Sequence, residues 1–327
     1  MLAAVIAAMI ASLGSGRYPV SVIEVLQFLS ARLGLAEMET QRQTFLSNLL
    51  WDIRLPRVLA AVLVGAALSV SGAAYQAVFR NPLVSPGLMG VLAGAACGAA
   101  LGMLLSGDWR VIQAAAFGAG VLAVLVSVGV ARFFGREAVI MLVLGGVVTC
   151  ALFTSLLSLI KYVADPQDQL PAIVYWLMGS LALATLDDVA RMAIPIGLGV
   201  CVLFGLARAL DAMSMGDDEA RTLGVPVTPV RYATIAAATL ACAATVAIAG
   251  MIGWIGLLIP HIARLLSGPS NSRLLPTSAC LGAIFLLGAD MLARNLIAEE
   301  IPIGIVIELL GVPAFLLVLR RARRSWL

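Results

Sequence analysis

Lysine, histidine and charged side chains in general are scarce in this chain of 327 residues. Lys161 is the single lysine and His261 the single histidine, and only 12% of the residues are charged, against 61% that are hydrophobic. A soluble globular domain carries roughly 25% charged residues. The composition therefore excludes an ordinary soluble domain. It also excludes a nucleic-acid-binding surface, because the formal net charge of +3 is a sum of scattered loop arginines.

The shortage of lysine also limits how the chain can obtain energy. A phosphate-binding loop of the GxxxxGK[ST] type needs a lysine after glycine, whereas Lys161 lies in LSLIKYVAD with no glycine before it. The HExxH and GxSxG motifs are also missing from the sequence. We therefore expect that the chain is not an enzyme, that it has no catalytic or cofactor-binding residue, and that a partner supplies ATP and Mg²⁺ if ATP is used.

Residues that could bind a metal are few and isolated. Five cysteines stand singly in apolar stretches without CxxC spacing: Cys97, Cys150, Cys201, Cys242 and Cys280. They are expected to be small apolar fillers rather than disulfides or zinc ligands. A lone histidine is a poor metal site, so His261, which follows Pro260, is expected to make a structural hydrogen bond. No metal site is predicted.

Long apolar stretches, in contrast, are abundant. Crossing a bilayer takes about 20 mostly apolar residues, and hydropathy predicts an all-α integral membrane protein with about ten transmembrane helices, forming one domain over residues 1–327. The first and eighth spans are shorter than this length requires. The predicted spans are residues 1–13, 56–79, 87–106, 111–131, 138–160, 189–208, 229–253, 254–266, 275–296 and 303–319.

Ten spans divide into two halves of five, here residues 1–186 and 187–327. An odd number of spans per half inserts the second half upside down, as in the inverted repeats of transporters. Residues 66–87 and 244–268 each run from a small-residue helix through glycine into a segment interrupted by proline. Such broken segments at matching places indicate a transport path, although close packing of helices explains individual glycines equally well.

Ionisable residues within the spans bear on the alternative of an ion-coupled secondary transporter, which needs titratable groups at membrane depth. Asp290 stands four residues before Arg294, the spacing of a helical ion pair, and this pair is expected to be structural. Glu308, in IVIELLG, has no such partner. The scarcity of such groups disfavours ion coupling, and an intramembrane lipid enzyme would have only Asp290 and His261.

The most polar loop spans residues 211–230. It predicts a short helix that begins after Ser214 or Gly216, carries acidic residues in its first turn, where the helix dipole favours them, and ends at Gly224 before Pro226. A chain that cannot hydrolyse ATP needs a rigid surface on which an ATPase can push. This loop is the candidate.

The arginines indicate the orientation of the chain in the membrane. With both termini cytoplasmic, the tail arginines and the loops at 132–136 and 208–231 lie inside, which satisfies the positive-inside bias modestly. Arg54, Arg57 and Arg294 then lie on the outer side. The tail arginines are Arg320, Arg321, Arg323 and Arg324.

Four segments of the sequence resemble a known transport family over essentially the whole chain. They are RLPRVLAAVLVGAALSVSGAAYQAVFRNPLVSPGLMGV, DDEARTLGV, GMIGWIGLLIPHIARLLSGPSNSRLLPTS and GADMLARNLIAEEIPIGIVIELLGVPAFLLVL. Together they are similar to the permeases of ABC importers for iron–siderophores, haem and vitamin B12. The resemblance implies a type II ABC importer permease of the bacterial inner membrane, in contact with lipid. It also implies three partners: a second copy of the chain, a cytoplasmic ATPase dimer and a periplasmic substrate-binding protein.

The resemblance also implies roles for particular residues. Arg54, Arg57 and Arg294 match the periplasmic arginines that receive acidic residues of the binding protein, and Asn81 and Leu83 match the cytoplasmic gate. Glu308 and the ending GVPAF depart from the family's commoner Thr and GAPFF. The residues that match the coupling helix, which rests in a cleft of the ATPase, are Asp218, Glu219, Ala220, Arg221, Thr222, Leu223 and Gly224.

On this basis we predict import of an iron chelate, either a siderophore or haem. Permeases for cobalamin and molybdate share the scaffold and remain alternatives. A cargo that is held loosely needs a path of small, apolar or uncharged polar residues. Polar residues of the second span fit that requirement, although their spacing suits packing between subunits equally: Ser69, Ser71, Tyr75 and Gln76.

Overall fold

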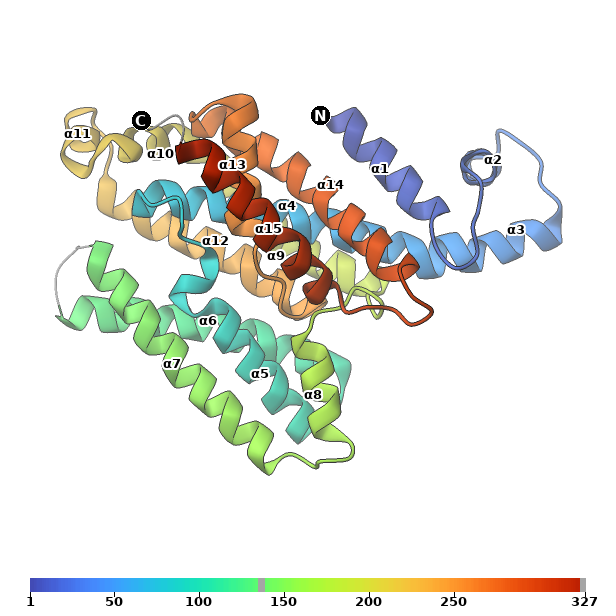
Figure 1. Cartoon of the computed structure of the whole chain (residues 1–327), viewed down its shortest axis with the longest axis horizontal. Coiled ribbons are helices and arrows are strands. Elements are labelled where there is room, and N and C mark those ends of the chain that lie inside the picture. The colour runs from blue at the N-terminus through green and yellow to red at the C-terminus, as the bar shows by residue number, and fades with distance from the viewer. Residues whose placement is uncertain (135–138, 324–327) are drawn as a thin grey trace.

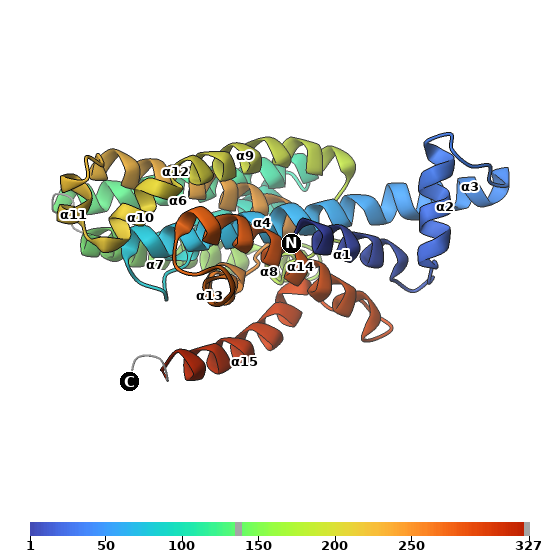
Figure 2. The ribbon, with the colours of Figure 1, turned by 90° about the horizontal axis from the view of Figure 1, so that it is seen from above.

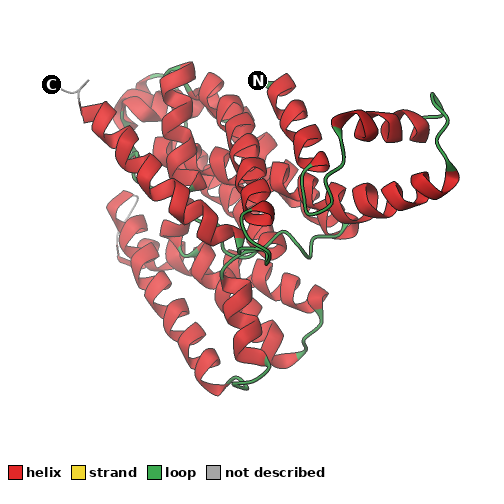
Figure 3. Cartoon of the chain, turned by 45° about the vertical axis from the view of Figure 1, so that its right-hand side comes forward, coloured by secondary structure: helices red, strands yellow, loops and turns green. Residues whose placement is uncertain are grey.

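The computed structural model describes the backbone of residues 1–134 and 139–323, with side chains described up to Phe133 and over 139–317. Within these residues the chain consists of helices and loops, without a strand (Figure 3). Six helices are long and apolar enough to cross a membrane: Thr40–Phe79, which includes α4 (Leu55–Phe79), α6 (Trp109–Phe134), α7 (Val139–Val163), α9 (Leu186–Gly205), α12 (Val227–Ala249) and α14 (Asn271–Asn295). Four further apolar helices lie outside this set: α1 (Leu2–Gly14), α5 (Val91–Leu105) and α13 (Ile255–Ser267) are shorter, and α15 (Ile303–Arg323) is apolar over Ile303–Leu317.

These ten helices coincide with the ten predicted spans, so the predicted all-α membrane fold is confirmed. Five of them precede residue 186 and five follow it. In Figure 1, α4 and α12 run side by side in opposite directions, as expected for the second span of each half if the halves are inverted. The exact boundary between the halves stays a prediction.

Several helices were not predicted from the sequence. They are α2 (Val22–Arg32), α3 (Thr40–Leu46), the π-helix η1 (Ser47–Arg54), α8 (Gln169–Leu177) and α10 (Ala207–Met215). The start of α2 does carry a recognisable signal, because Ser21 and Glu24 form a capping box in which each side chain accepts a hydrogen bond from the other's backbone N–H. In Figure 2, α3, η1 and α4 form one long helix that projects beyond the bundle beside α2.

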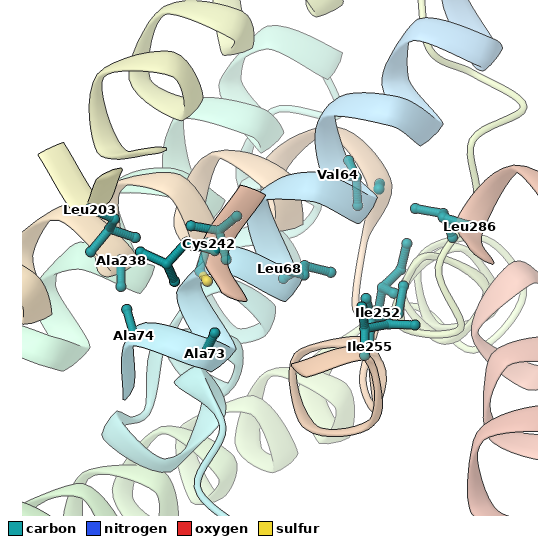
Figure 4. Close-up of a cluster of buried hydrophobic side chains, with 14 of the residues drawn as sticks. Val64, Leu68, Ala73, Ala74, Leu203, Ala238, Cys242, Ile252, Ile255 and Leu286 are labelled. Carbon is teal, nitrogen blue, oxygen red and sulfur yellow. The ribbon is translucent and has the colours of Figure 1, made fainter. Parts of the chain in front are cut away.

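The core of the bundle forms around α4 and α12, each with 78% of its apolar window buried. Figure 4 shows Val64 and Leu68 of α4 close to Leu286 of α14 and to Ile252 and Ile255 near the start of α13. Glycines let backbones meet: a Cβ on Gly65 would clash with the carbonyl of Gly282, and one on Gly72 with that of Gly256. Small residues therefore bring α14 and α13 directly onto α4, as is common where membrane helices cross.

The helical backbone is interrupted at matching places in the two halves, after the second span of each. After α4, Arg80 has φ 50° and the 3₁₀ helix η2 (Pro86–Met89) ends at Gly90, with φ 87°. After α12, Gly250 has φ 69° and Trp254 φ 63°, directly before α13. The broken segments predicted from glycine and proline are thus present in both halves, and in each case a short helix follows.

The two ends of the molecule differ in character. At one end in Figures 1 and 2 lie α10, α11 (Asp217–Thr222) and the carboxyl end of α15, and at the other lie α2 and α3. The polar loop predicted to contact an ATPase and the helices just before α4 are therefore separated by the length of the bundle.

Candidate functional site

The short helix predicted in the polar loop is present as α11. Gly216 caps its start, with φ 146°, and Gly224 lies just beyond its end, with φ 80°, both conformations that favour glycine. Ser214, the alternative start, instead lies in α10 and donates its hydroxyl to the carbonyl of Leu210 at 2.8 Å. The first turn carries Asp217 together with Asp218 and Glu219, as the helix dipole favours.

One face of α11 is anchored and the other is exposed. Ala220 is fully buried, whereas Leu223 is 63% exposed. Asp218 pairs only within the helix, with Arg221 at 2.8 Å, and both side chains are at least half exposed. An exposed leucine beside exposed charges is a surface suited to a partner protein.

Asp217 ties the helix to two spans. Its Oδ2 lies 2.6 Å from Nη2 of Arg231 in α12, and its Oδ1 lies 3.9 Å from Nη2 of Arg80, which ends α4. Asp211 of α10 likewise accepts hydrogen bonds from Ser270 and from the backbone N–H of Asn271, at the start of α14. These contacts link α10 and α11 to α4, α12 and α14.

The two gate residues lie in the loop that begins at Arg80. Asn81 Oδ1 accepts the backbone N–H of Leu83 at 2.9 Å, a local turn. The Leu83 side chain is 54% exposed. Because Arg80 pairs with Asp217, the structure brings the predicted gate loop next to the predicted coupling helix.

The three arginines predicted to lie on the outer side also lie together, in a cluster that we call the outer arginine cluster: Arg54, Arg57, Arg294, Asp290 and Glu300. Asp290 is fully buried and lies 2.7 Å from Arg57 and 3.1 Å from Arg294, so the predicted Asp290–Arg294 pair is present. Glu300 pairs with Arg57 at 2.8 Å. Of the two acids, Glu300 is the exposed one, with 36% of its side chain accessible.

The other two arginines of the cluster reach back toward the amino terminus. Arg54 donates to the carbonyls of Leu13 and Tyr18, at 2.6 and 2.5 Å, and Arg294 donates to Ser12 Oγ at 2.9 Å. All three arginines are less than 10% exposed. The cluster thus joins α1, α4 and α14, and docking of a binding protein on these arginines stays a prediction.

Two interpretations of the sequence are wrong. Ser69, Ser71, Tyr75 and Gln76 do not face a path in this chain, because α4 is central and all four are at most 3% exposed. Ser69 donates to the carbonyl of Gly65, and Gln76 accepts from Arg264 at 2.7 Å. His261 Nδ1 is buried without a hydrogen-bond partner among the described residues, and its ring instead packs edge-on against Phe315 at 6.0 Å.

A cavity of about 630 Å³ lies between α5, α6 and α8. Trp109, Tyr175 and Trp176 line it, with Asp168 and Gln169 among its polar residues. None of the predicted site residues lies there, and no sequence pattern indicated it.

Ten apolar helices, a polar helix exposed at one end and broken segments in both halves define a membrane transport subunit. The chain belongs to the FecCD transport family, whose model matches residues 4–321. It is an ABC importer permease of that family, as the resemblance implied.

Relatives of known function and a solved structure agree with this assignment. The molybdate import system permease MolB of Haemophilus influenzae is 37% identical over 318 residues, covering 96% of this chain and 92% of its own. The hemin transport system permease HmuU of Yersinia pestis is 36% identical, covering 93% and 94%. A metal-chelate type ABC transporter in an inward-facing conformation superposes with a TM-score of 0.86 at 33% identity, covering 98% of this chain and 97% of the other.

Proposed function

We propose that this permease imports an iron chelate, either a siderophore or haem, and that a cytoplasmic ATPase dimer drives it through α11. The observation that carries this proposal is the match to the FecCD family over residues 4–321, combined with an exposed α11 held by Asp217. The likeness to the hemin permease HmuU supports a chelate as cargo. MolB, at similar identity, makes molybdate the second candidate.

The contacts around α11 suggest how force would be transmitted. An ATPase that moves α11 would also move Arg80, at the start of the gate loop, and Arg231, in α12. Asp211 adds α14 to the same unit. Two copies of the chain would then rock between outward-open and inward-open states, with the cargo passing between them.

The outer arginine cluster is proposed as the place where the periplasmic binding protein docks. Charge complementarity would fix the register of docking and speed the encounter. Because the arginines are already paired inside the chain, docking would proceed by exchange. A carboxylate of the binding protein would replace Glu300, the exposed partner of Arg57.

The proposed location is the bacterial inner membrane, with both termini in the cytoplasm. This orientation puts α10 and α11 on the ATPase side, and Arg208, Arg221 and Arg273 with them. Arg136 and Arg324 lie outside the described residues, as do the side chains of Arg320, Arg321 and Arg323.

The proposal is tested by reconstituting the permease in proteoliposomes with its ATPase and binding protein. Hydrolysis of ATP should rise when a ferric siderophore or hemin is supplied with the binding protein, and the iron should appear inside. Stimulation and uptake with molybdate alone would reassign the cargo. Transport of any cargo without the ATPase would overturn the proposal.

A further inference from the structure

Glu308 is a carboxylate within an apolar span. It is the sixth residue of α15, so it lies about 8 Å along the helix axis from the first residue. Five residues without charge precede it, IGIVI, and LLGVPAF follows it. Its position in the sequence is therefore inside the span and not at a polar end.

The start of α15 is fixed by backbone hydrogen bonds. The N–H groups of Ile303 and Gly304 donate to the carbonyls of Gly179 and Met178, just after α8, at 3.1 and 3.0 Å. Ser180 N–H donates to Ala249 O, at the end of α12, at 2.9 Å. We call this meeting of α8, α12 and α15 the three-helix seam. Glu308 lies between one and two helical turns beyond it.

Glu308 differs from the other acidic residue deep in a span. Asp290 is buried between two arginines. Glu308 is exposed, and no hydrogen bond or ion pair joins it to another residue of the described chain. An ionised carboxylate facing hydrocarbon is costly, and charged residues in membrane spans almost always face the bundle interior or a water-filled cavity.

The rest of α15 indicates where that water lies. The helix packs on α13 and α14, with Gly311 against Trp254 and Phe315 against His261. Its other side is uncovered, and α15 stands at the edge of the bundle in Figure 2. Glu308 shares that side with Leu309, which is 70% exposed, and with Val312 and Leu316. His261 of α13 lies beside Phe315, about two turns along α15 from Glu308, and Arg264 is engaged with Gln76 of α4.

The fifth span of the first half, α7, has a related character. It occupies the position in its half that α15 occupies in the second. Thr154, Ser155 and Ser158 are exposed along it, among apolar residues. The fifth span of each half thus carries exposed polar groups on a surface that this chain alone leaves uncovered.

We infer that Glu308 lines the water-filled path between two copies of the chain and acts as a charge filter for the cargo. The inference rests on the proposed function, because the path is that of a dimeric permease. Two carboxylates in one path favour a cargo that is cationic or that presents hydrogen-bond donors, and they repel oxyanions. Glu308 therefore favours a cationic or neutral metal chelate over molybdate, whereas a chelate with net negative charge is repelled as molybdate is.

A cysteine reporter tests this filter without knowledge of the cargo. The full chain, with its five cysteines replaced by alanine, carries Val312→Cys one turn from Glu308. It is assembled with the ATPase in vesicles and treated with a cationic and an anionic methanethiosulfonate of matched size, with and without nucleotide. The cation should react faster, and Glu308→Gln should lower the ratio of the two rates about tenfold. Leu309→Gln is the matched control and should leave the ratio unchanged.

Three outcomes overturn the inference. Failure of both charged reagents to modify the cysteine in every nucleotide state shows that no water reaches this face. A rate ratio that Glu308→Gln leaves unchanged shows that Glu308 is not the filter. An equal fall in the ratio with Leu309→Gln shows a general disturbance of α15. None of these readouts depends on transport, so failure of the proposed function is scored separately, by ATP hydrolysis and iron uptake.

A second arm asks about cargo class directly. In proteoliposomes containing the ATPase and binding protein, Glu308→Gln should raise uptake of labelled molybdate relative to a cationic ferric hydroxamate chelate by about tenfold. An unchanged uptake ratio contradicts selection of cargo by Glu308, even if the cysteine reporter shows that water reaches the path.

Discussion

Asp217 of α11 and Arg231 of α12 form an ion pair of 2.6 Å across the boundary between the polar loop and the membrane span. Arg231 is 2% exposed, whereas the Asp217 side chain is 23% exposed. The pair therefore links a buried cation to a partly accessible anion on a short helix. Removing the Asp217 carboxylate leaves the buried Arg231 guanidinium without this anionic partner. Loss of one partner of a buried ion pair lowers the stability of the folded protein strongly.

Asp217→Asn should uncouple α11 from the spans. We expect a loss of about 3 kcal/mol in stability, measured by thermal unfolding in detergent, and a fall in stimulated ATP hydrolysis. Asp218→Asn is the matched control, because Asp218 pairs only with Arg221 at the surface. That change should cost less than about 1 kcal/mol. Equal effects of the two substitutions would contradict the role of Asp217.

Leu223→Asp should abolish stimulation of the ATPase. The side chain is exposed on α11, and a charge there opposes burial in an apolar cleft of a partner. Membrane insertion and thermal stability should stay unchanged, since the Leu223 side chain is 63% exposed. Leu223→Met is the control and should retain stimulation. Normal stimulation by the aspartate variant would reject α11 as the coupling helix.

Asp290→Asn should destabilise the outer end strongly. Its carboxylate is fully buried between Arg57 and Arg294, and loss of one partner of a buried ion pair costs about 3–5 kcal/mol. Glu300→Gln removes an exposed partner of Arg57 and should cost less than about 1 kcal/mol. Thermal unfolding of the two purified variants measures the difference, and a ranking in the reverse order would contradict it.

Glu300→Gln also tests docking by exchange. Freeing Arg57 from Glu300 should strengthen binding of the substrate-binding protein several-fold, because its carboxylate no longer competes with an internal one. Binding to the permease in nanodiscs measures this effect as a function of salt. Weaker binding would show that Glu300 itself contributes to the docking surface.

Gly282→Ala should loosen the contact between α4 and α14. A Cβ at this position clashes with Ser69 Oγ and with the carbonyl of Gly65, and overpacking of this kind costs about 1–3 kcal/mol. Gly288→Ala, in the same helix, meets nothing within 4 Å and should leave the melting temperature unchanged or slightly raised. A stable Gly282→Ala protein would contradict the close backbone approach.

The spans could be predicted from the sequence because apolar length is a property of each segment taken alone. The ion pair between Asp290 and Arg294 was predictable for a similar reason, since four residues are one helical turn. Arg57 could not be added to it, because it lies 233 residues away from Asp290 in the chain. Sequence reasoning placed this arginine on the surface, where a charge beside a span usually lies.

The short helices were missed for a different reason. Because α2 and α8 are neither long nor uniformly apolar, hydropathy does not predict them. The Ser21–Glu24 capping box is the sequence signal that indicates the start of α2. The polar residues of α4 were misread because a polar side chain in a span suggests a path. In this fold α4 is surrounded by other helices. The Ser69 hydroxyl donates to the carbonyl of Gly65 and the Gln76 amide accepts from Arg264, while the hydroxyls of Ser71 and Tyr75 are buried.

Backbone hydrogen bonds join the three helices of the three-helix seam, through Gly179, Ala249 and Gly304. Bonds between peptide groups do not depend on which side chains neighbouring positions carry. Residues along the open side of α15, including Glu308, can therefore be exchanged in evolution without loss of the backbone hydrogen bonds that hold the start of this helix. A scaffold built in this way can acquire a new cargo by a few substitutions while its moving parts stay the same.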